Sequence, residues 1–291
     1  WDDNKVTAGG EGAWICRNSY GAGWGEQGYF YVSYNNNSFL DYNAYWPTRM
    51  DYEPEAQVYG YDELGNYAAT EWGGRSGFML VKCTATQSQL ISKVATYAMA
   101  AGTTIGIDIY DHFDAITGRL SGQRTHQAGL PCELPGYYTF TLDEPVAVTA
   151  GNDFYIRIYY QTPSYDYPIP IEKAIAGYSA PHIETNKAWI GYDSNGESNY
   201  WFAIGSGTGY LWDPCVKAYA EPLLSWAGTQ STDWNSAANW NPGEVPSPKQ
   251  NVDIPATATP PLISNALPSP APCKPLTIRE GASLPLAAGA A

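Results

Sequence analysis

The chain has 291 residues, a formal net charge of −14 and no cluster of Lys or Arg residues. Without a basic patch, the sequence excludes nucleic acid and an anionic membrane surface as partners. No apolar run approaches the roughly 20 residues that a membrane-spanning helix requires, so no membrane-spanning segment is predicted. The 24 Tyr and 11 Trp residues, with 29 Gly and 22 Pro spread along the chain, favour a turn-rich, mainly β protein.

Low Lys content with abundant Asn, Ser, Thr, Tyr and Gly is typical of an extracellular or cell-surface protein. The chain begins at Trp1 without Met and ends within a strand-forming pattern, so we expect both ends to be cut from a longer protein. The cysteines allow one or two disulfides of undefined connectivity and leave at least one thiol over. They lie far apart and form no CxxC pair, so no metal site or other cofactor is predicted: Cys16, Cys83, Cys132, Cys215 and Cys273.

The first predicted segment, residues 1–45, contains a Gly-rich loop followed by a strand at 29–34 that is rich in aromatic residues. Residues 12–21 read GAWICRNSYG and residues 23–30 read GWGEQGYF. This stretch resembles the Asn-containing segment of papain-family cysteine peptidases, in which an apolar strand is followed by N-S-W-G and then by W-G-x-x-G-Y. The agreement extends over about twenty contiguous positions with the glycines in register.

The resemblance implies a role for three side chains. In that family a Cys thiolate attacks the scissile carbonyl, a His activates the thiol, and an Asn orients the imidazole. Asn18 matches the orienting Asn. Trp24 matches an aromatic residue that shields the Asn-His hydrogen bond from water, which strengthens this bond by lowering the local dielectric. Tyr20 replaces the usual Trp and implies a weaker shield.

The residues that would complete this catalytic site are absent from the sequence. The opening Trp1-Asp2-Asp3 fits the family's G-W-D-D turn, which would place the catalytic His just before Trp1, and the Cys would lie much farther upstream. Cys16 occupies a core position of the family, so it is predicted to be a structural thiol. The chain alone is therefore not expected to hydrolyse peptides. The three histidines of the chain fall in the next segment and are predicted to be surface or packing residues: His112, His126 and His182.

The second segment, residues 46–222, carries short candidate strands at 76–82, 91–99, 104–110, 137–142, 153–160 and 201–204. Ile105, Ile107 and Ile109 alternate with Gly106, Asp108 and Tyr110, the pattern of a half-buried strand. The regular spacing of these strands predicts an antiparallel β-sandwich of jelly-roll type.

Parts of this segment resemble the lectin-like β-sandwich that follows the peptidase domain in many prokaryotic papain-like peptidases, notably VYGYDELG at 58–65 and GNDFYI at 151–156. The resemblance implies carbohydrate binding through aromatic rings, although Tyr and Trp also fill core and surface positions in any sandwich. The Asp193-Ser194-Asn195-Gly196-Glu197 stretch lacks a full series of calcium ligands and is predicted to be a turn. The candidate sugar contacts are aromatic residues in polar loops: Tyr165, Tyr167, Tyr192, Tyr200 and Trp201.

The third segment, residues 223–291, places Trp226, Trp234 and Trp240 among Asn, Ser and Gly, and Pro becomes frequent from Pro242. This composition indicates either a linker with the start of a β-rich module or a partly disordered tail, and the three Trp favour the module. The segment resembles modules of large secreted or surface-anchored bacterial proteins, which implies a role in attachment or spacing.

Two hypotheses for the function follow from these observations. In the first, the chain is a fragment of a secreted papain-like cysteine endopeptidase, with a peptide or protein substrate bound mainly by the missing part. Its sandwich would then be an accessory domain for substrate, glycan or cell-surface binding. In the second, the chain is a non-catalytic secreted protein that binds carbohydrate or protein, or serves in adhesion, on a degenerate peptidase scaffold. Whether the complete protein is an enzyme is left open by the sequence.

Overall fold

The computed structural model describes residues 1–38, 56–71, 74–192, 200–207, 209–247, 250–263 and 276–286. The chain divides into two compact units, residues 1–52 and 53–291. Apart from one short 3-10 turn, the regular structure of the described residues consists of β-strands, which confirms the mainly β class. No helix in this part of the chain has the length and apolarity needed to cross a membrane. The stretch Asp193 to Glu197 and Cys273 lie outside the described residues.

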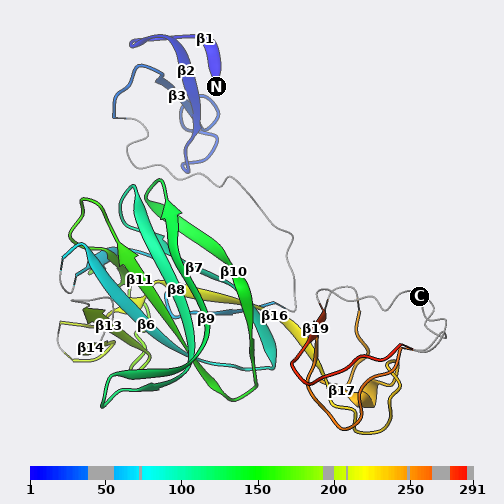
Figure 1. The fold of residues 1–291 in the computed structure, drawn as a ribbon. Coiled ribbons are helices and arrows are strands. Elements are labelled where there is room, and N and C mark those ends of the chain that lie inside the picture. Colours follow the sequence, from blue (N-terminus) through cyan, green and yellow to red (C-terminus); the bar gives the residue numbers. More distant parts are fainter. Residues whose placement is uncertain are drawn as a thin grey trace. The chain divides into compact units, whose positions relative to one another are not determined.

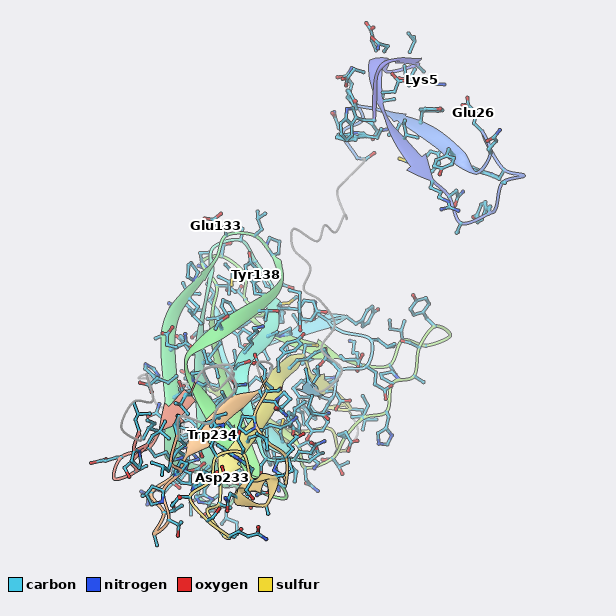
Figure 2. The ribbon with its side chains drawn as sticks, turned by 90° about the vertical axis from the view of Figure 1, so that its right-hand side faces the viewer. Lys5, Glu26, Glu133, Tyr138, Asp233 and Trp234 are labelled. Atoms are coloured by element: carbon cyan, nitrogen blue, oxygen red, sulfur yellow. The ribbon has the colours of Figure 1, made fainter. Side chains whose placement is uncertain are left out.

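The first unit is a three-stranded antiparallel sheet formed by β1 (Asp2–Thr7), β2 (Gly10–Arg17) and β3 (Tyr29–Ser33) (Figure 1). The ion pair between Lys5 and Glu26, 3.5 Å, joins β1 to the loop before β3 (Figure 2). Among residues 1–38, Ala13 is the only apolar side chain that is fully buried, whereas Trp14 and Ile15 of the central strand are exposed. A sheet this small has no core of its own and requires further packing to be stable.

The second unit contains a β-sandwich whose larger sheet has six antiparallel strands in the order β14-β13-β6-β11-β8-β9. The facing sheet contains β10, β7 and β16 as neighbours (Figure 1). Strand β4 pairs with β16, and a small sheet has the order β15-β12-β5. The strand bounds are β4 (Gln57–Tyr59), β5 (Ala68–Thr70), β6 (Ser76–Thr84), β7 (Gln89–Ala98), β8 (Thr103–Asp114), β9 (Arg119–Cys132), β10 (Gly136–Val148), β11 (Asp153–Gln161), β12 (Ile169–Glu172), β13 (Ala188–Tyr192), β14 (Tyr200–Ile204), β15 (Asp213–Pro214) and β16 (Val216–Trp226).

Each of the six strands predicted in residues 46–222 is present, and the core lies between the two large sheets. Ile107 and Ile156 face this core, as their alternation predicts. The prediction that β8 is only half-buried is wrong, because Asp108 and Tyr110 on its other face are buried as well. The cause is a second cluster on the outer face of the six-stranded sheet, where Phe113 packs against buried aromatic residues contributed by β8, β11 and β13.

The cysteines of the described residues form no disulfide with one another. Cys16, Cys83, Cys132 and Cys215 are all free thiols, and all but Cys16 are buried. Burial raises the pKa of the Cys83 thiol to about 12, since the charged thiolate is poorly solvated there. These side chains therefore act as small apolar core residues.

Beyond the sandwich, β16 continues into a smaller module with η1 (Ala237–Asn239), β17 (Trp240–Asn241), β18 (Asn251–Ile254) and β19 (Leu276–Ile278). The indole rings of Trp226 and Trp234 each pack edge-to-face on Trp240, with centroids 4.9 and 4.7 Å apart. Trp240 Nε1 donates to the Trp234 carbonyl at 2.8 Å. The three Trp thus form the core of a folded β module, in which Trp234 is labelled in Figure 2.

Candidate functional site

Asn18 directly follows β2 and opens the loop 18–28 that returns the chain to β3. Its backbone N–H donates to the Gly28 carbonyl at 2.9 Å, which closes the base of the loop. Its side-chain Oδ1 accepts a hydrogen bond from the Ser19 N–H at 2.7 Å. Because a carbonyl oxygen has two lone pairs, Oδ1 can accept a second hydrogen bond, such as one from an imidazole N–H.

Glycine is required at two positions of this loop. Gly25 has a φ of 58° and Gly28 a φ of 92°, both in the left-handed region. A Cβ atom on Gly25 would collide with the Tyr29 carbonyl oxygen, and one on Gly28 would lie 3.1 Å from the Gly21 carbonyl oxygen. The glycine spacing of the W-G-x-x-G-Y pattern therefore reflects backbone geometry that other residues adopt only with strain.

The loop also holds an aromatic stack. Trp24 packs edge-to-face on Tyr20 and on Phe30, with ring centroids 5.8 and 5.6 Å apart. Tyr20 and Trp24, the two residues predicted to shield the Asn-His hydrogen bond, are thus in contact with each other. Their rings remain exposed, and the described contacts of the Asn18 side chain do not include them.

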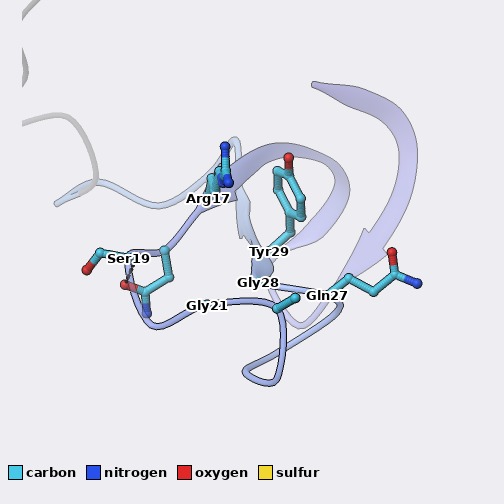
Figure 3. Close-up of a pocket in the computed structure, with 8 residues that line it drawn as sticks. Arg17, Ser19, Gly21, Gln27, Gly28 and Tyr29 are labelled. Atoms are coloured by element: carbon cyan, nitrogen blue, oxygen red, sulfur yellow. Dashed lines mark hydrogen bonds between the residues drawn. The ribbon is translucent and has the colours of Figure 1, made fainter.

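A pocket of about 440 Å³ opens beside Asn18 (Figure 3). Half-buried Asn18 offers an amide there, Arg17 offers a positive charge, and Tyr29 offers a ring. The lining residues come from the end of β2, the loop and the start of β3: Arg17, Asn18, Ser19, Gly21, Ala22, Gln27, Gly28 and Tyr29.

Cys16 does not supply a nucleophile in the first unit. Burial raises the pKa of its thiol, which disfavours the thiolate, and its Sγ lies 3.9 Å from the Trp14 carbonyl. Residues 1–52 contain no His. His126 lies in the sandwich, with Nδ1 2.6 Å from Asp108 Oδ1, and His182 lies 3.5 Å from Glu184. The first unit therefore contains the Asn18 amide but no His that could pair with it.

Four of the five candidate sugar contacts lie at one end of the six-stranded sheet. Tyr165 and Tyr167 follow β11, whose last residue Gln161 pairs with Ser76, the first residue of β6. Tyr192 pairs with Tyr200 across β13 and β14, and the neighbouring Gly191 pairs with Phe78 near the same end of β6. All four tyrosines are exposed: Tyr165, Tyr167, Tyr192 and Tyr200.

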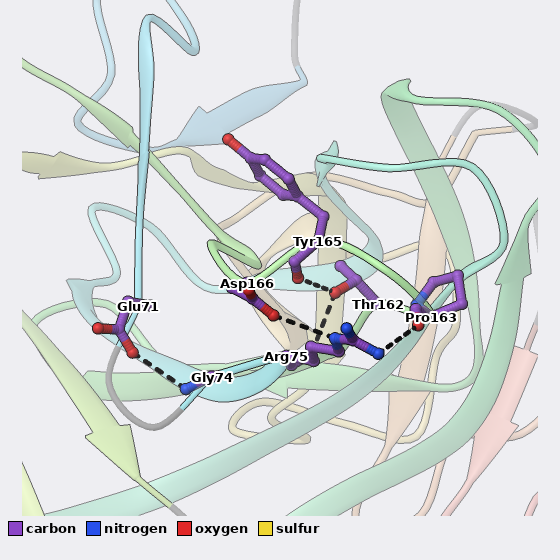
Figure 4. Close-up of polar contacts among 7 residues, drawn as sticks. All are labelled: Glu71, Gly74, Arg75, Thr162, Pro163, Tyr165 and Asp166. Atoms are coloured by element: carbon purple, nitrogen blue, oxygen red, sulfur yellow. Dashed lines mark hydrogen bonds and ion pairs between the residues drawn. The ribbon is translucent and has the colours of Figure 1, made fainter.

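The loop after β11 is fixed by polar contacts around Arg75 (Figure 4). Arg75 Nε donates to Asp166 at 3.0 Å, and its NH1 donates to the Pro163 carbonyl at 3.0 Å. The Thr162 hydroxyl donates to the Tyr165 carbonyl. These contacts anchor the loop that presents the Tyr165 and Tyr167 rings, which lie 5.8 Å apart.

Trp201, the fifth candidate, packs differently. Its ring lies 6.2 Å from Phe78 and 5.9 Å from Phe113, within the outer aromatic cluster. Its Nε1 is buried and has no hydrogen-bond partner among the described residues. In the structure Trp201 is partly buried and contributes to the packing of this cluster.

A polar network that was not predicted from the sequence lies on the outer face of the same sheet. Asp108 accepts from Arg157 Nε at 3.0 Å and from Gln123 Nε2 at 2.8 Å, next to His126. The guanidinium of Arg157 stacks on Phe78 and Tyr110, 5.1 and 5.3 Å from the ring centroids. Only the strand register joins these residues, because they come from four strands, β6, β8, β9 and β11.

A second polar group is built from buried carboxylates near β12 and β15. Glu172 accepts from the Glu63 N–H at 2.9 Å and from the Leu64 N–H, and Asp213 accepts from the Glu184 N–H at 3.1 Å. These acids hold loop backbone in place. No group of three or more His, Cys, Asp or Glu side chains with the arrangement of a metal site occurs in the described ranges.

Residues 58–220 match the family model of a lectin-like domain, which covers more than half of the chain. The chain belongs to the lectin-like domain family. The lectin-like sandwich expected from the sequence is thereby confirmed. Residues 225–291 match a domain of unknown function, DUF8693. A search of curated proteins gave no match.

Two solved structures share the lectin-like fold. The first is a variant of the clostridial cysteine protease Cwp84 after propeptide cleavage, with a TM-score of 0.57 and 14% identity over 76% of this chain and 56% of that one. The second contains the cysteine protease and lectin-like domains of Cwp84, a surface layer associated protein of Clostridium difficile. Its TM-score is 0.52, with 13% identity over 72% of this chain and 46% of that one. The chain thus spans about half the length of both. The second structure combines a cysteine protease domain with a lectin-like domain, the two kinds of domain that the sequence resembles.

Proposed function

We propose that the chain is part of a secreted, surface-associated cysteine peptidase in which Asn18 orients the catalytic imidazole. The observation that carries the proposal is the loop 18–28, which presents the Asn18 amide at a pocket and holds Tyr20 and Trp24 in one aromatic stack. An amide in such a place has one remaining acceptor site for an imidazole N–H. Fixing the ring would direct its second nitrogen toward the thiol, as the family mechanism requires.

The incomplete packing of the first unit supports the same proposal. Its sheet leaves Val6, Trp14 and Ile15 exposed, and its loop leaves Tyr20 and Trp24 exposed. Such a sheet gains stability by burying these side chains, at roughly 25 cal/mol for each Å² of apolar surface. The remainder of a peptidase domain, carrying the Cys and the His, would cover this surface and complete the site.

The test is an Asn18→Ala substitution in the complete protein. We expect turnover of a peptide substrate to fall about 100-fold, the contribution typical of positioned acid-base catalysis. Alkylation of the nucleophilic thiol by iodoacetamide should remain detectable, because Asn18 orients and does not attack. Asn4→Ala, on exposed β1, is the control and should keep full turnover. Unchanged turnover in the Asn18 variant would remove Asn18 from the mechanism.

We further propose that the lectin-like sandwich binds a neutral glycan through the tyrosines at the end of its larger sheet. Tyr165, Tyr167, Tyr192 and Tyr200 expose their rings there, and aromatic rings stack on the apolar faces of sugars. A net charge of −14 disfavours an anionic polysaccharide. Glycan-array binding by residues 53–291, which form one compact unit, tests this role.

A non-catalytic binding protein is the second candidate function. It rests on the sandwich alone, whose exposed tyrosines are available to a ligand whether or not a catalytic site is present. The two candidates differ in what the DNA encodes upstream of Trp1. An in-frame Cys-Gly-x-Cys-Trp segment and a His shortly before Trp1 support the peptidase, whereas a start codon with a signal peptide directly before Trp1 supports the binding protein.

A further inference from the structure

Three strands of the C-terminal module, β16, β18 and β19, pair in parallel, whereas β17 pairs antiparallel with the end of β16. The described strand pairs of the sandwich are all antiparallel. Leu224 of β16 pairs with Val252 of β18, and Val252 pairs with Leu276 of β19. A second parallel series joins Asp233 to Leu262 and Ile263 to Leu286. In both series the partners are separated by roughly 25 residues along the chain, a period typical of solenoid repeats.

Each repeat therefore contributes one strand to each of the two parallel series, and each strand runs in the same direction as its partner in the previous repeat. Successive passes then stack as rungs, and each rung contacts only its neighbours, which defines a solenoid. The interior is apolar, with Val252 and Ile254 fully buried against the Trp cluster. One rung-to-rung contact is polar: buried Asp253 accepts from Ser225 Oγ on one side at 3.3 Å and from Arg279 Nε on the other at 2.7 Å.

The first rung is continuous with the sandwich. The first part of β16 pairs with β7 of the sandwich, and its last part pairs with β18. Glu221 lies at the junction, where Oε1 accepts from Ser92 of β7 at 2.8 Å and Oε2 accepts from Asn251 of β18 at 3.2 Å. The sandwich thus covers one end of the stack of rungs.

The other end of the stack is uncovered in the described residues. The order of strands ends at β19, which pairs there with β18 alone. Leu276, Ile278 and Leu286 of this last rung are exposed by 39%, 46% and 61%. A terminal rung normally has a polar outer face, and an exposed apolar strand edge is a template for pairing with a further strand.

We propose that the described strands between residues 223 and 286 form the base of a parallel β-solenoid. We propose further that the edge of β19, which is unpaired in the described residues, pairs with a further rung from the segment that follows residue 291 in the complete protein. The rungs already present come from consecutive stretches of one chain, and the next pass of that chain meets β19 in the same parallel direction. A second copy that met this edge about a two-fold axis would pair antiparallel instead. The solenoid extends from the sandwich as a stalk.

Hydrogen exchange of the β19 amides tests the proposal. The chain 1–291 is compared with the complete protein, and the segment that follows residue 291 should slow exchange in residues 276–278 at least about tenfold. The amides of β6 serve as the internal control, because their ladders are complete in both proteins. Equal exchange of β19 in the two proteins, or an encoded protein that stops at Ala291, would overturn the proposal.

Light scattering tests the alternative that a second copy of the chain, and not a further rung, pairs with the edge of β19. The chain 1–291 should be monomeric at the concentrations used for exchange. A dimer that Ile278→Lys converts to a monomer would assign the edge to a second copy and overturn the proposal. In the complete protein, Ile278→Lys should speed the exchange of residues 276–278 toward that of the chain 1–291, while β6 stays protected.

Discussion

Asp108 and Arg157 form a buried ion pair across neighbouring strands of the six-stranded sheet, with both Nε and NH2 of Arg157 donating to Asp108 Oδ2 at 3.0 and 2.8 Å. The side chains of Asp108 and Arg157 are exposed by only 4% and 17%. Breaking such a pair leaves an uncompensated charge in a poorly hydrated place.

Asp108→Ala is therefore expected to lower the free energy of unfolding by about 3 kcal/mol. Urea unfolding of residues 53–291 measures this change. Asp166→Ala is the control, because the Asp166–Arg75 pair is exposed by 66% and 58% and should be worth less than about 1 kcal/mol. A loss of less than about 1 kcal/mol for Asp108→Ala, as expected for the exposed pair, would contradict this prediction.

The stability of the sandwich should depend on pH through Asp213. Burial raises the pKa of this carboxyl, the Glu184 N–H opposes the rise, and the nearby Glu172 and Glu184 carboxylates add to it, so that the pKa is about 7. The native state keeps a proton that the unfolded chain releases near pH 3.8, so stability falls as the pH rises from there toward 7. Asp213→Asn should remove this slope in urea unfolding series across that range. The slope should persist in the control variant Asp166→Asn, and a slope unaffected by Asp213→Asn would contradict the assignment.

Glycan binding by the sandwich should depend on the tyrosines at the end of the larger sheet. Tyr165→Ala and Tyr200→Ala are each expected to weaken binding about three- to tenfold, the range of a single aromatic contact. Titration calorimetry with a glycan selected on the array gives the affinities. Tyr67→Ala is the matched control, since Tyr67 is also exposed but lies beside Ile171, at the far end of β12 from the Tyr165 loop. Equal losses for all three variants would argue against a site at this end.

The geometry of the Asn18 loop should make Gly25 irreplaceable. Gly25→Ala places a Cβ against the Tyr29 carbonyl oxygen at a φ of 58°, a strain of about 1–3 kcal/mol. We expect lower peptide turnover by the complete protein and a lower melting temperature of its peptidase domain. Gly23→Ala should change neither, because a Cβ at Gly23 meets no atom within 4 Å and its φ is negative or extended. Similar behaviour of the two variants would mean that the loop adapts freely.

The sequence alone was sufficient wherever the signal is local. The alternation of Ile105, Ile107 and Ile109 predicts β8 because side chains of a strand alternate between its faces. Asn18 and its Gly-rich loop are recognisable because the motif is contiguous and because Gly25 and Gly28 adopt positive φ angles that favour glycine. Strand β9 was not predicted, because polar residues such as Arg119, Gln123 and His126 interrupt any apolar alternation.

Only the tertiary structure decided which residues meet across strands. Asp108 and Arg157 are far apart in sequence, and the register that pairs β8 with β11 depends on packing of both sheet faces. The same holds for Trp201, which was predicted to lie in a polar loop but lies on β14, where its ring packs against Phe78 and Phe113. The parallel rungs of the C-terminal module likewise depend on long-range pairing. Composition and motifs thus determine the fold class and the peptidase-like loop. Contacts between distant strands determine which polar groups are buried, because burial depends on neighbouring residues that no local sequence pattern specifies.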